Sequence, residues 1–357
     1  MPPKATVAVV GTGGLASAIC YALAASPHPL HVLVLGRDGR RTAEISYIGA
    51  ARAIGTEVTF QPLTVDLAVN GALARTLDQT RPDGVVVAAS PQSPWERRTA
   101  PSAWTALVER AGYGLTLPLQ AQFVLEASRF LAAEHSSAWL INGCLPDAVN
   151  PVLARLGTAP ICGIGNSHLI TTSAQAALGI PEPGRLHILA HHLHLHPPAA
   201  GVEEALIWAD GVPLTDVGGL LAPQRATSRA ELNHVTGHAA ALVIADLAAD
   251  HPVESNLPGP LGLPGGYPVT VIPPTPAGPA RVELRLPKGM SLAKAVAFNE
   301  RVSVHDGVTV TDGRVVFTRV SPGDLPAELA DGFSVDDLDD VIRHMHQLRD
   351  RLREKSP

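Results

Sequence analysis

The first half of the chain alternates short apolar runs with longer amphipathic stretches. Consecutive apolar, β-branched residues are typical of strands buried on both faces, as in parallel sheets. Such runs predict strands at 6–10, 31–35, 57–63, 84–89, 138–142 and 160–165. The intervening patterns predict helices at 15–25, 70–79 and 117–134. This order predicts an α/β fold, a Rossmann-type doubly wound parallel sheet with right-handed crossovers.

From about residue 167 the pattern changes to helical stretches mixed with short strands and two proline-rich passages, 257–268 and 273–279. An Asp-Gly turn at Asp312 predicts a hairpin over 309–317. Ser334 can cap a final helix that reaches about Lys355. We therefore expect a dinucleotide-binding Rossmann domain at 1–165. An α+β domain for substrate binding and oligomerisation is expected at 166–357.

A glycine-rich turn follows the first strand, with the sequence Gly11-Thr12-Gly13-Gly14-Leu15-Ala16. Gly11 allows the tight turn, Gly13 lets the backbone approach a pyrophosphate, and the small Ala16 permits close helix–strand packing. The helix start offers free N–H groups to an anion. The predicted cofactor-binding residues are Gly11, Thr12, Gly13, Gly14, Leu15, Arg37, Ala89, Ser90 and Asn142.

The end of the second strand bears on which dinucleotide binds. NAD-binding units usually place an acidic residue there for the ribose 2′-OH, but Gly36 stands at that position and Arg37 follows it. A guanidinium can bind a 2′-phosphate through two hydrogen bonds, which favours NADP. NAD remains the alternative, in which the arginines are a solvated helix start and Asp38 holds the ribose.

Composition narrows the class of protein. Of the 357 residues, 46% are hydrophobic and 17% charged, which argues for a substantial core and against disorder. A net charge of −6 argues against a nucleic-acid surface. No apolar run has the length of a membrane span, and the start does not have the pattern of a signal peptide. Three cysteines in apolar contexts indicate reduced, buried thiols. We expect a cytoplasmic protein without nucleic-acid or membrane partners.

The order of these features resembles the lactate/malate dehydrogenase superfamily up to about residue 300. The glycine turn is one similarity, and 90–98 is similar to the family's mobile active-site loop, which carries substrate-binding arginines. Three further segments match in order: 140–149 is similar to the Asn-Pro turn, 188–192 to the catalytic-histidine segment, and 237–269 to the late helix and strand pair. The resemblance implies a small-molecule substrate and a homodimer or homotetramer.

This sequence also departs from that family. The family has an Asp that orients its catalytic histidine and, on the same helix, an Arg that binds the substrate carboxylate. Asn166 falls near the Asp position, and the segment 166–173 contains no arginine. Either Asn142 or Leu145 takes the place of the family's Asn. A simple malate or lactate dehydrogenase is therefore not expected.

Three residues are candidates for catalysis. Hydride transfer to a carbonyl needs an acid, and histidine suits this because its ordinary pKa lies near neutrality; we assign the role to His192, with a structural strand histidine as the alternative. Asn142, at a strand's carboxyl end, could bind the carboxamide or the reacting oxygen, or only stabilise a turn. Arg97 could close over an anionic group, or be an exposed charge.

Histidines cluster between His187 and His196. In a strand, His192, His194 and His196 would share one face and could bind a transition metal. The NAD- and metal-dependent glycosidases of family four resemble this chain in the same places, but Gly165 stands near their Cys ligand and His191 replaces their Asn. No carboxylate or Cys completes an evident ligand set, so we predict no metal site.

Three functions follow as hypotheses. The first is an NAD(P)-dependent oxidoreductase that transfers a hydride between nicotinamide and the carbonyl or alcohol of a small, non-standard substrate. The second is redox-assisted elimination or hydrolysis with NAD and a metal, as in the glycosidases. The third is a cofactor-binding protein without dehydrogenase turnover.

Overall fold

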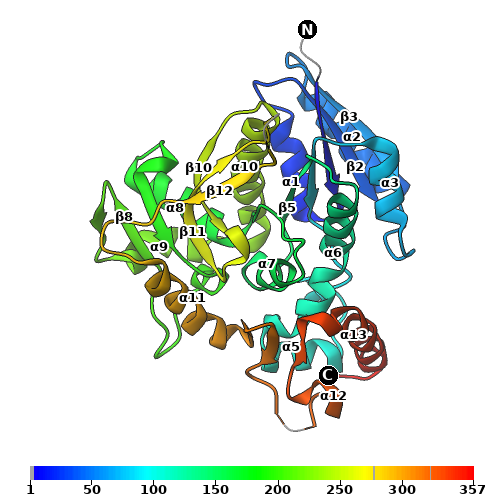
Figure 1. Cartoon of the computed structure of the whole chain (residues 1–357), viewed down its shortest axis with the longest axis vertical. Coiled ribbons are helices and arrows are strands. Elements are labelled where there is room, and N and C mark those ends of the chain that lie inside the picture. Colours follow the sequence, from blue (N-terminus) through cyan, green and yellow to red (C-terminus); the bar gives the residue numbers. More distant parts are fainter. Residues whose placement is uncertain (1–3, 276–277, 322) are drawn as a thin grey trace.

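A six-stranded parallel sheet forms the centre of the computed structural model, which describes residues 4–275, 278–321 and 323–357 (Figure 1). Its order is β3-β2-β1-β4-β5-β6. The strands are β1 (Ala5–Val10), β2 (Leu30–Gly36), β3 (Val58–Thr64), β4 (Gly84–Val87), β5 (Trp139–Asn142) and β6 (Cys162–Gly163). All six predicted strands are confirmed. The strand order reverses between β1 and β4, where open α/β sheets bind ligands.

Helices cover both faces of this sheet. They include α1 (Gly14–Leu23), α2 (Gly39–Arg52), α3 (Ala72–Thr80), α6 (Leu117–Ala133) and α7 (Pro146–Arg155). The long helix α10 (Arg229–Ala248) packs directly against α1. A Cβ atom at Gly237 would lie 2.5 Å from the Ala18 side chain, so a glycine is needed where these helices meet. The later half of the chain thus covers the first helix of the Rossmann unit.

The second half contains short antiparallel sheets. Helix α8 (Asn166–Leu178) precedes β7 (Leu186–Leu189), β8 (Leu206–Ala209), β9 (Val212–Pro213) and α9 (Val217–Ala226). After α10 come β10 (Val253–Pro258), β11 (Gly266–Ile272), β12 (Arg281–Leu284) and α11 (Leu292–Asp306). Part of the second predicted proline-rich passage, 276–277, lies outside the described residues.

Strand β7 is too short to carry the face of three histidines that the sequence analysis considered. Strand β7 ends at Leu189, and His192–Leu195 forms a 3₁₀ turn. The two-residue alternation of a strand does not extend to His192 or His196, so the premise of the shared face was wrong.

The described residues from 308 onward fold back on the first half of the chain. Strands β13 (Val308–Thr311) and β14 (Arg314–Phe317) form the predicted hairpin, joined through Asp312 and Gly313 at φ +50° and +76°. Strand β15 (Phe333–Ser334) extends it. Ser334 caps a short 3₁₀ turn, and α13 (Leu338–Arg353) follows. Helix α13 packs on α5 (Ala103–Ala111) and α6.

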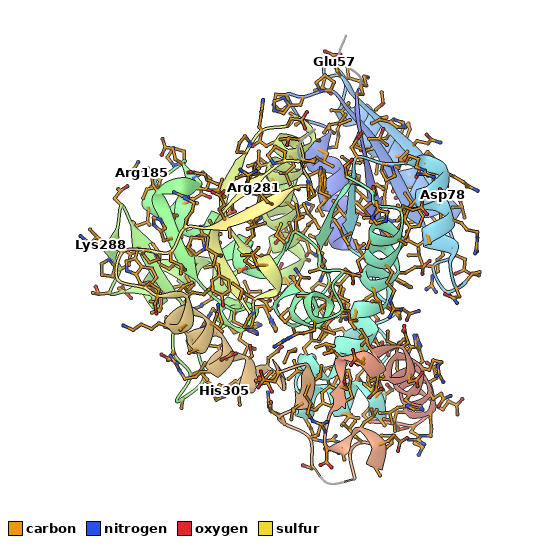
Figure 2. The ribbon with its side chains drawn as sticks, in the orientation of Figure 1. Glu57, Asp78, Arg185, Arg281, Lys288 and His305 are labelled. Atoms are coloured by element: carbon orange, nitrogen blue, oxygen red, sulfur yellow. The ribbon has the colours of Figure 1, made fainter. Side chains whose placement is uncertain are left out.

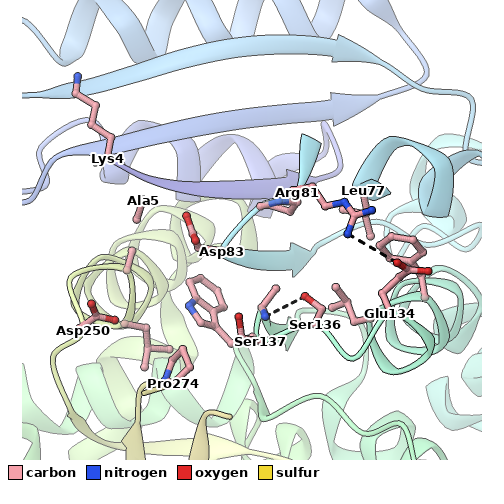
Figure 3. Close-up of a pocket in the computed structure, with 17 residues that line it drawn as sticks. Lys4, Ala5, Leu77, Arg81, Asp83, Glu134, Ser136, Ser137, Asp250 and Pro274 are labelled. Atoms are coloured by element: carbon pink, nitrogen blue, oxygen red, sulfur yellow. Dashed lines mark hydrogen bonds and ion pairs between the residues drawn. The ribbon is translucent and has the colours of Figure 1, made fainter. Parts of the chain in front are cut away.

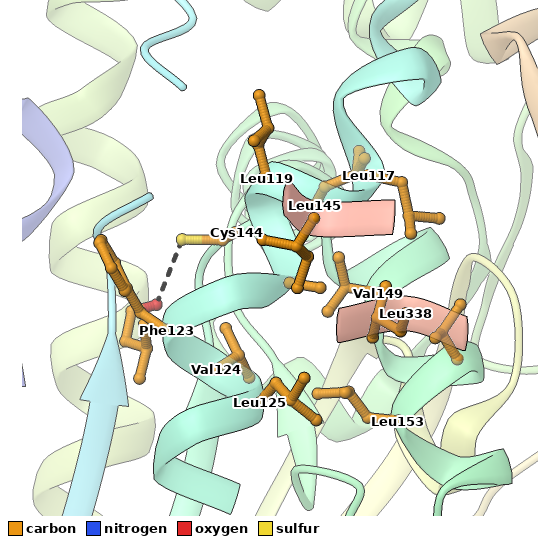
Figure 4. Close-up of a cluster of buried hydrophobic side chains, with 14 of the residues drawn as sticks. Leu117, Leu119, Phe123, Val124, Leu125, Cys144, Leu145, Val149, Leu153 and Leu338 are labelled. Atoms are coloured by element: carbon orange, nitrogen blue, oxygen red, sulfur yellow. Dashed lines mark hydrogen bonds between the residues drawn. The ribbon is translucent and has the colours of Figure 1, made fainter. Parts of the chain in front are cut away.

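The hydrophobic core crosses the boundary expected at residue 165. One cluster joins side chains of β1, β4 and α6 to Phe317, Leu338 and Met345 from the end of the chain. Figure 4 shows Leu338 among Leu145, Val149 and Leu153. The division into domains 1–165 and 166–357 stays a prediction. Among the described residues, no helix combines the length and apolarity needed to cross a membrane.

Candidate active site

The glycine turn forms one half of the candidate site. Gly11 has φ +133°, and a Cβ there would lie 2.7 Å from the Ala88 carbonyl oxygen, so only glycine fits. Gly13 is exposed and caps α1, and a Cβ there would meet nothing within 4 Å. The turn therefore leaves open space directly before the free N–H groups of α1, as a diphosphate requires.

Basic side chains surround the end of β2. Arg37 is exposed. Asp38 accepts a hydrogen bond from the Arg41 backbone N–H at 3.1 Å and so caps α2. The Arg41 guanidinium donates to Ser17 Oγ of α1 at 3.2 Å, which places a second cation close to the glycine turn. Arg41 was not among the cofactor-binding residues predicted from the sequence.

Further candidates border the turn. Ala89 and Ser90 are half-buried after β4. The Ser90 hydroxyl donates to the Gln92 carbonyl at 2.7 Å. Asn233 of α10 is a residue that the sequence did not single out: a Cβ at Gly14 would lie 2.9 Å from its Nδ2 atom. The side of the turn that faces α10 therefore has an amide beside it.

Asn142 holds the turn that follows β5. Its Oδ1 accepts the Cys144 N–H at 2.7 Å, and its Nδ2 donates to the Cys144 carbonyl and to Asn150 Oδ1 at 3.0 and 2.9 Å. The side chain is fully buried. These bonds fix a turn in which Leu145 has a left-handed φ of +45°, and α7 starts from it. Asp147 lies in the first turn of that helix.

His192 lies between two buried carboxylates. Its Nε2 is hydrogen-bonded to Asp306 Oδ1 at 2.8 Å, and its Nδ1 lies 3.3 Å from Asp147 Oδ2. The aspartates are each 2% exposed and the His192 side chain 10% exposed. Asp147 comes from α7 after β5, and Asp306 ends α11, so distant segments build this cluster.

The two aspartates change the charge of the histidine. Burial lowers the His192 pKa, but the charges of Asp306 and Asp147 and the hydrogen bond to Asp306 outweigh burial and raise it to about 10. Burial by itself would raise the Asp147 pKa, yet the imidazoles of His191 and His192 hold it below its ordinary value. At neutral pH His192 is therefore an imidazolium held between the two carboxyl groups.

The neighbouring histidines differ from His192. Burial, reinforced by the charge of His192, lowers the His191 pKa to about 4. His194 stacks on Phe298 and its Nδ1 accepts the His191 backbone N–H at 2.9 Å, a structural role. His196 is exposed.

Residues 90–102, here called the β4–α5 segment, are fastened to the end of the chain. Glu96 is 7% exposed and receives two hydrogen bonds from Arg353. Arg97 is exposed and pairs with Glu109 of α5. Arg98 lies over the Trp95 ring, 5.9 Å from its centroid. Neither arginine is shown in contact with the His192 cluster.

Sequence reasoning missed both carboxylates of that cluster. Asp147 stood in the segment 140–149, which had been matched to the Asn-Pro turn, and its position soon after a strand's carboxyl end was a usable signal. Asp306 carried no local signal because it lies 114 residues from His192 and reaches it only through α11. The side chain of Asn166, expected near the family's Asp position, lies outside the described residues.

A cavity of about 410 Å³ opens at the other edge of the sheet (Figure 3). It is lined by residues that precede β1, β4 and β5, among them Lys4, Asp83 and Ser137. Arg81 and Glu134 form an ion pair beside it. Charged side chains such as Glu57 and Asp78 lie at the periphery (Figure 2). Ligand-binding residues of such folds come from the carboxyl ends of strands, so this cavity is not the candidate site.

Comparisons with known proteins concern the fold. No protein-family model matches the chain, and no curated protein matches it. A lactate dehydrogenase from a Medee basin deep-sea metagenome library is 10% identical, with a TM-score of 0.52, over 84% of this chain and 96% of that one. The minor L-lactate dehydrogenase from Enterococcus mundtii, in a ligand-bound form, is 13% identical, with the same TM-score and coverages.

A lactate dehydrogenase from Cryptosporidium parvum, complexed with lactic acid and nicotinamide adenine dinucleotide, is 16% identical. Its TM-score is 0.47, over 86% of this chain and 98% of that one. At such identities the likeness concerns the fold. The α/β fold of the lactate dehydrogenases, expected from the sequence, is confirmed.

Proposed function

We propose that the chain is an NAD(P)-dependent oxidoreductase acting on the carbonyl or alcohol of a small substrate. The observation that carries the proposal is the open cradle at Gly13, at the carboxyl edge of the sheet, where β5 also leads into Asp147 of the His192 cluster. Gly143 joins the two halves, because a Cβ there would lie 3.4 Å from the Leu15 side chain. Coenzyme and polar cluster would therefore occupy adjacent places.

The residues present fit a dinucleotide. Gly11, Thr12, Gly13, Gly14 and Leu15 would hold the diphosphate at the start of α1. The coenzyme, when bound, supplies or accepts the hydride at nicotinamide C4. Ala89 and Ser90 follow β4 and Asn142 is the last residue of β5, so all three lie at the carboxyl ends of strands, on the nicotinamide side of such sites.

NADP is the coenzyme that we favour. Gly36 leaves no carboxylate at the end of β2, and Arg37 is exposed beside it. Asp38, the residue that would hold the ribose of NAD, already caps α2. A 2′-phosphate can be bound by guanidinium groups, and Arg41, which is paired with Glu44 at 3.0 Å and bonded to Ser17, would supply a second one.

His192 is the proposed acid. In the protonated cluster, Nε2 is held by Asp306, while Nδ1 contacts Asp147 at 3.3 Å without hydrogen-bond geometry. The Nδ1 proton is therefore the more weakly held and is the one available to an oxygen that gains negative charge. Asp147 and Asp306 fix the ring and retain its charge.

The charge of the cluster restricts the substrate. Without a bound metal ion, the two carboxylates and one imidazolium of the cluster would repel a carboxylate on the substrate, and the segment 166–173 at the start of α8 contains no arginine to bind one. The proposed substrate is therefore neutral or cationic near its reacting carbon, unlike lactate. Asn142 acts by positioning Asp147, and Arg97 would reach a ligand only after leaving Glu109.

The remaining parts of the proposal concern the cellular compartment and the oligomeric state. Cys20, Cys144 and Cys162 are all buried and free, which agrees with a reducing compartment, the cytoplasm. A homodimer or homotetramer remains the proposed assembly.

Gly13→Val tests the proposal. Gly13 has a φ of −75°, so a side chain causes no backbone strain, yet it fills the space before α1. We expect the variant to fold normally and to lose NADPH binding at least 100-fold in a fluorescence titration. Gly218→Ala in α9 is the matched control, with only an ordinary contact at 3.9 Å. Unchanged affinity in Gly13→Val, or no pyridine coenzyme bound by the unmodified protein, contradicts the proposal.

A further inference from the structure

Several buried polar atoms around His192 lack hydrogen-bond partners among the described residues. They are Asp147 Oδ1, Asp306 Oδ2 and His192 Nδ1. Two of these three are acceptor oxygens, and an unpaired polar atom inside a protein typically costs about 1–3 kcal/mol. A cluster of orphaned acceptors indicates that a positively charged ligand belongs there.

We infer that Asp147, His191 and His192 form a binding site for one divalent transition-metal ion of the zinc class. One ligand atom from each of the three residues lies within 4.8 Å of the other two, and all three residues are buried. Imidazole and carboxylate are ligands that zinc accepts, and three protein ligands leave a fourth position open.

The contact between Asp147 and His192 supports a metal. Asp147 Oδ2 and His192 Nδ1 are 3.3 Å apart, yet Nδ1 has no hydrogen-bond geometry. Two ligands bound to one tetrahedral zinc at about 2.0–2.1 Å are separated by about 3.3 Å. The distance between the two atoms is thus that expected of two ligands on one metal ion, and their orientation is not that of a hydrogen bond.

Asp306 completes the arrangement from the other side of the ring. Its Oδ1 is hydrogen-bonded to His192 Nε2 at 2.8 Å. Metal-binding histidines almost always donate their second ring N–H to a carboxylate or carbonyl, which orients the ring and raises its basicity. His191 stands next to His192, with ring centroids 4.5 Å apart. Each of the four side chains thus has a position that suits a metal centre.

Metal binding is measured without substrate or coenzyme. Its chemical consequence, however, rests on the proposed function, because the ion would replace the Nδ1 proton as the group that polarises the substrate oxygen. The His187–His196 segment therefore supplies two ligands, His191 and His192, in a set other than the strand face considered from the sequence.

Zinc titration of the full-length, chelator-treated protein tests the inference. A second group, His28, Asp246 and His251, lies at the surface and could also bind zinc, so the measurements use a His251→Gln background. Calorimetry should show one zinc per chain. His191→Gln and Asp147→Asn should each abolish that binding, and Asp306→Asn should weaken it about 10–100-fold. His196→Gln, at an exposed histidine, should leave it unchanged.

Circular dichroism and NADPH titration of each variant show whether the fold and the glycine turn persist. Absence of zinc binding in the His251→Gln protein overturns the inference, as does binding that survives both His191→Gln and Asp147→Asn. A metal bound by a protein that takes no coenzyme would support this site while contradicting the proposed function. Coenzyme binding without zinc binding would support the proposed function while contradicting the metal site.

Discussion

Arg353, four residues from the chain end, forms a two-point ion pair with Glu96 of the β4–α5 segment, through bonds of 2.7 and 2.6 Å. Arg349, one turn earlier on α13, donates to the Pro91 carbonyl at 3.1 Å. The segment that resembles a mobile loop of dehydrogenases is thus fastened at both of these points by the last helix.

Loss of this ion pair should loosen the β4–α5 segment. Arg353→Gln leaves the buried Glu96 carboxylate with Gln92 as its remaining side-chain partner. We expect a loss of about 1–3 kcal/mol in the free energy of unfolding, because a buried acceptor loses a charged donor. Denaturant titration measures the loss, and hydrogen exchange should rise over 90–102. Arg351→Gln, at an exposed position, serves as the control; equal exchange in both variants would show that the ion pair does not hold the segment.

Removing the charges of the His192 cluster one after another should change the free energy of unfolding non-additively. His192→Gln removes the cation between Asp147 and Asp306, and the uncompensated buried carboxylates should destabilise the fold by about 3–5 kcal/mol. Changing both aspartates to Asn in the same chain should recover at least half of that loss. Chelator-treated proteins are compared by urea denaturation at pH 7.5. Additive losses across the three substitutions would mean that the residues do not act as one charged unit.

Acid should destabilise the protein through His168. Burial lowers the His168 pKa from 6.5 to about 4, so between these values the unfolded chain binds more protons than the folded one. Stability is therefore complete above pH 6.5 and falls as the pH drops toward 4, by about 3 kcal/mol from this residue. His168→Leu should flatten the pH dependence of the unfolding free energy, whereas exposed His234→Gln should not. An unchanged slope in His168→Leu would place the acid sensitivity elsewhere.

Coenzyme preference should depend on the arginines after β2. Arg37→Ala should weaken NADPH about tenfold or more while leaving NADH within about twofold, because only NADPH carries the 2′-phosphate. Arg41→Ala should weaken NADPH less, since Arg41 also bonds to Ser17. Fluorescence titration with both coenzymes gives the ratio. Equal affinities for NADPH and NADH in the unmodified protein would rule out the NADP assignment.

The parallel sheet could be predicted from the sequence because each strand can be recognised from its own residues. The runs ending at Val10 and Val87 are continuously apolar, since helices bury both faces of those strands. The glycine turn could be recognised as well, because the residues of its motif are consecutive in the sequence. The hairpin at Asp312 and Gly313 followed from turn chemistry alone.

The polar cluster was only partly predictable, because its residues meet through the fold. His192 was identified from its place in the chain, but its partners come from α7 and α11. The strand expected through His196 stopped at Leu189, where the chain turns into a 3₁₀ segment. The spacing of the histidines cannot show where the strand ends, because histidine is tolerated both in a strand and in a 3₁₀ turn.

Side chains late in the sequence complete the packing of strands that come early in it. Phe317, Leu338 and Met345 fill the apolar cluster beneath β1 and β4, so one apolar face of the sheet stays uncovered during synthesis until these residues have been added. A chain that lacks these residues would therefore expose this apolar face, and large exposed apolar patches favour aggregation.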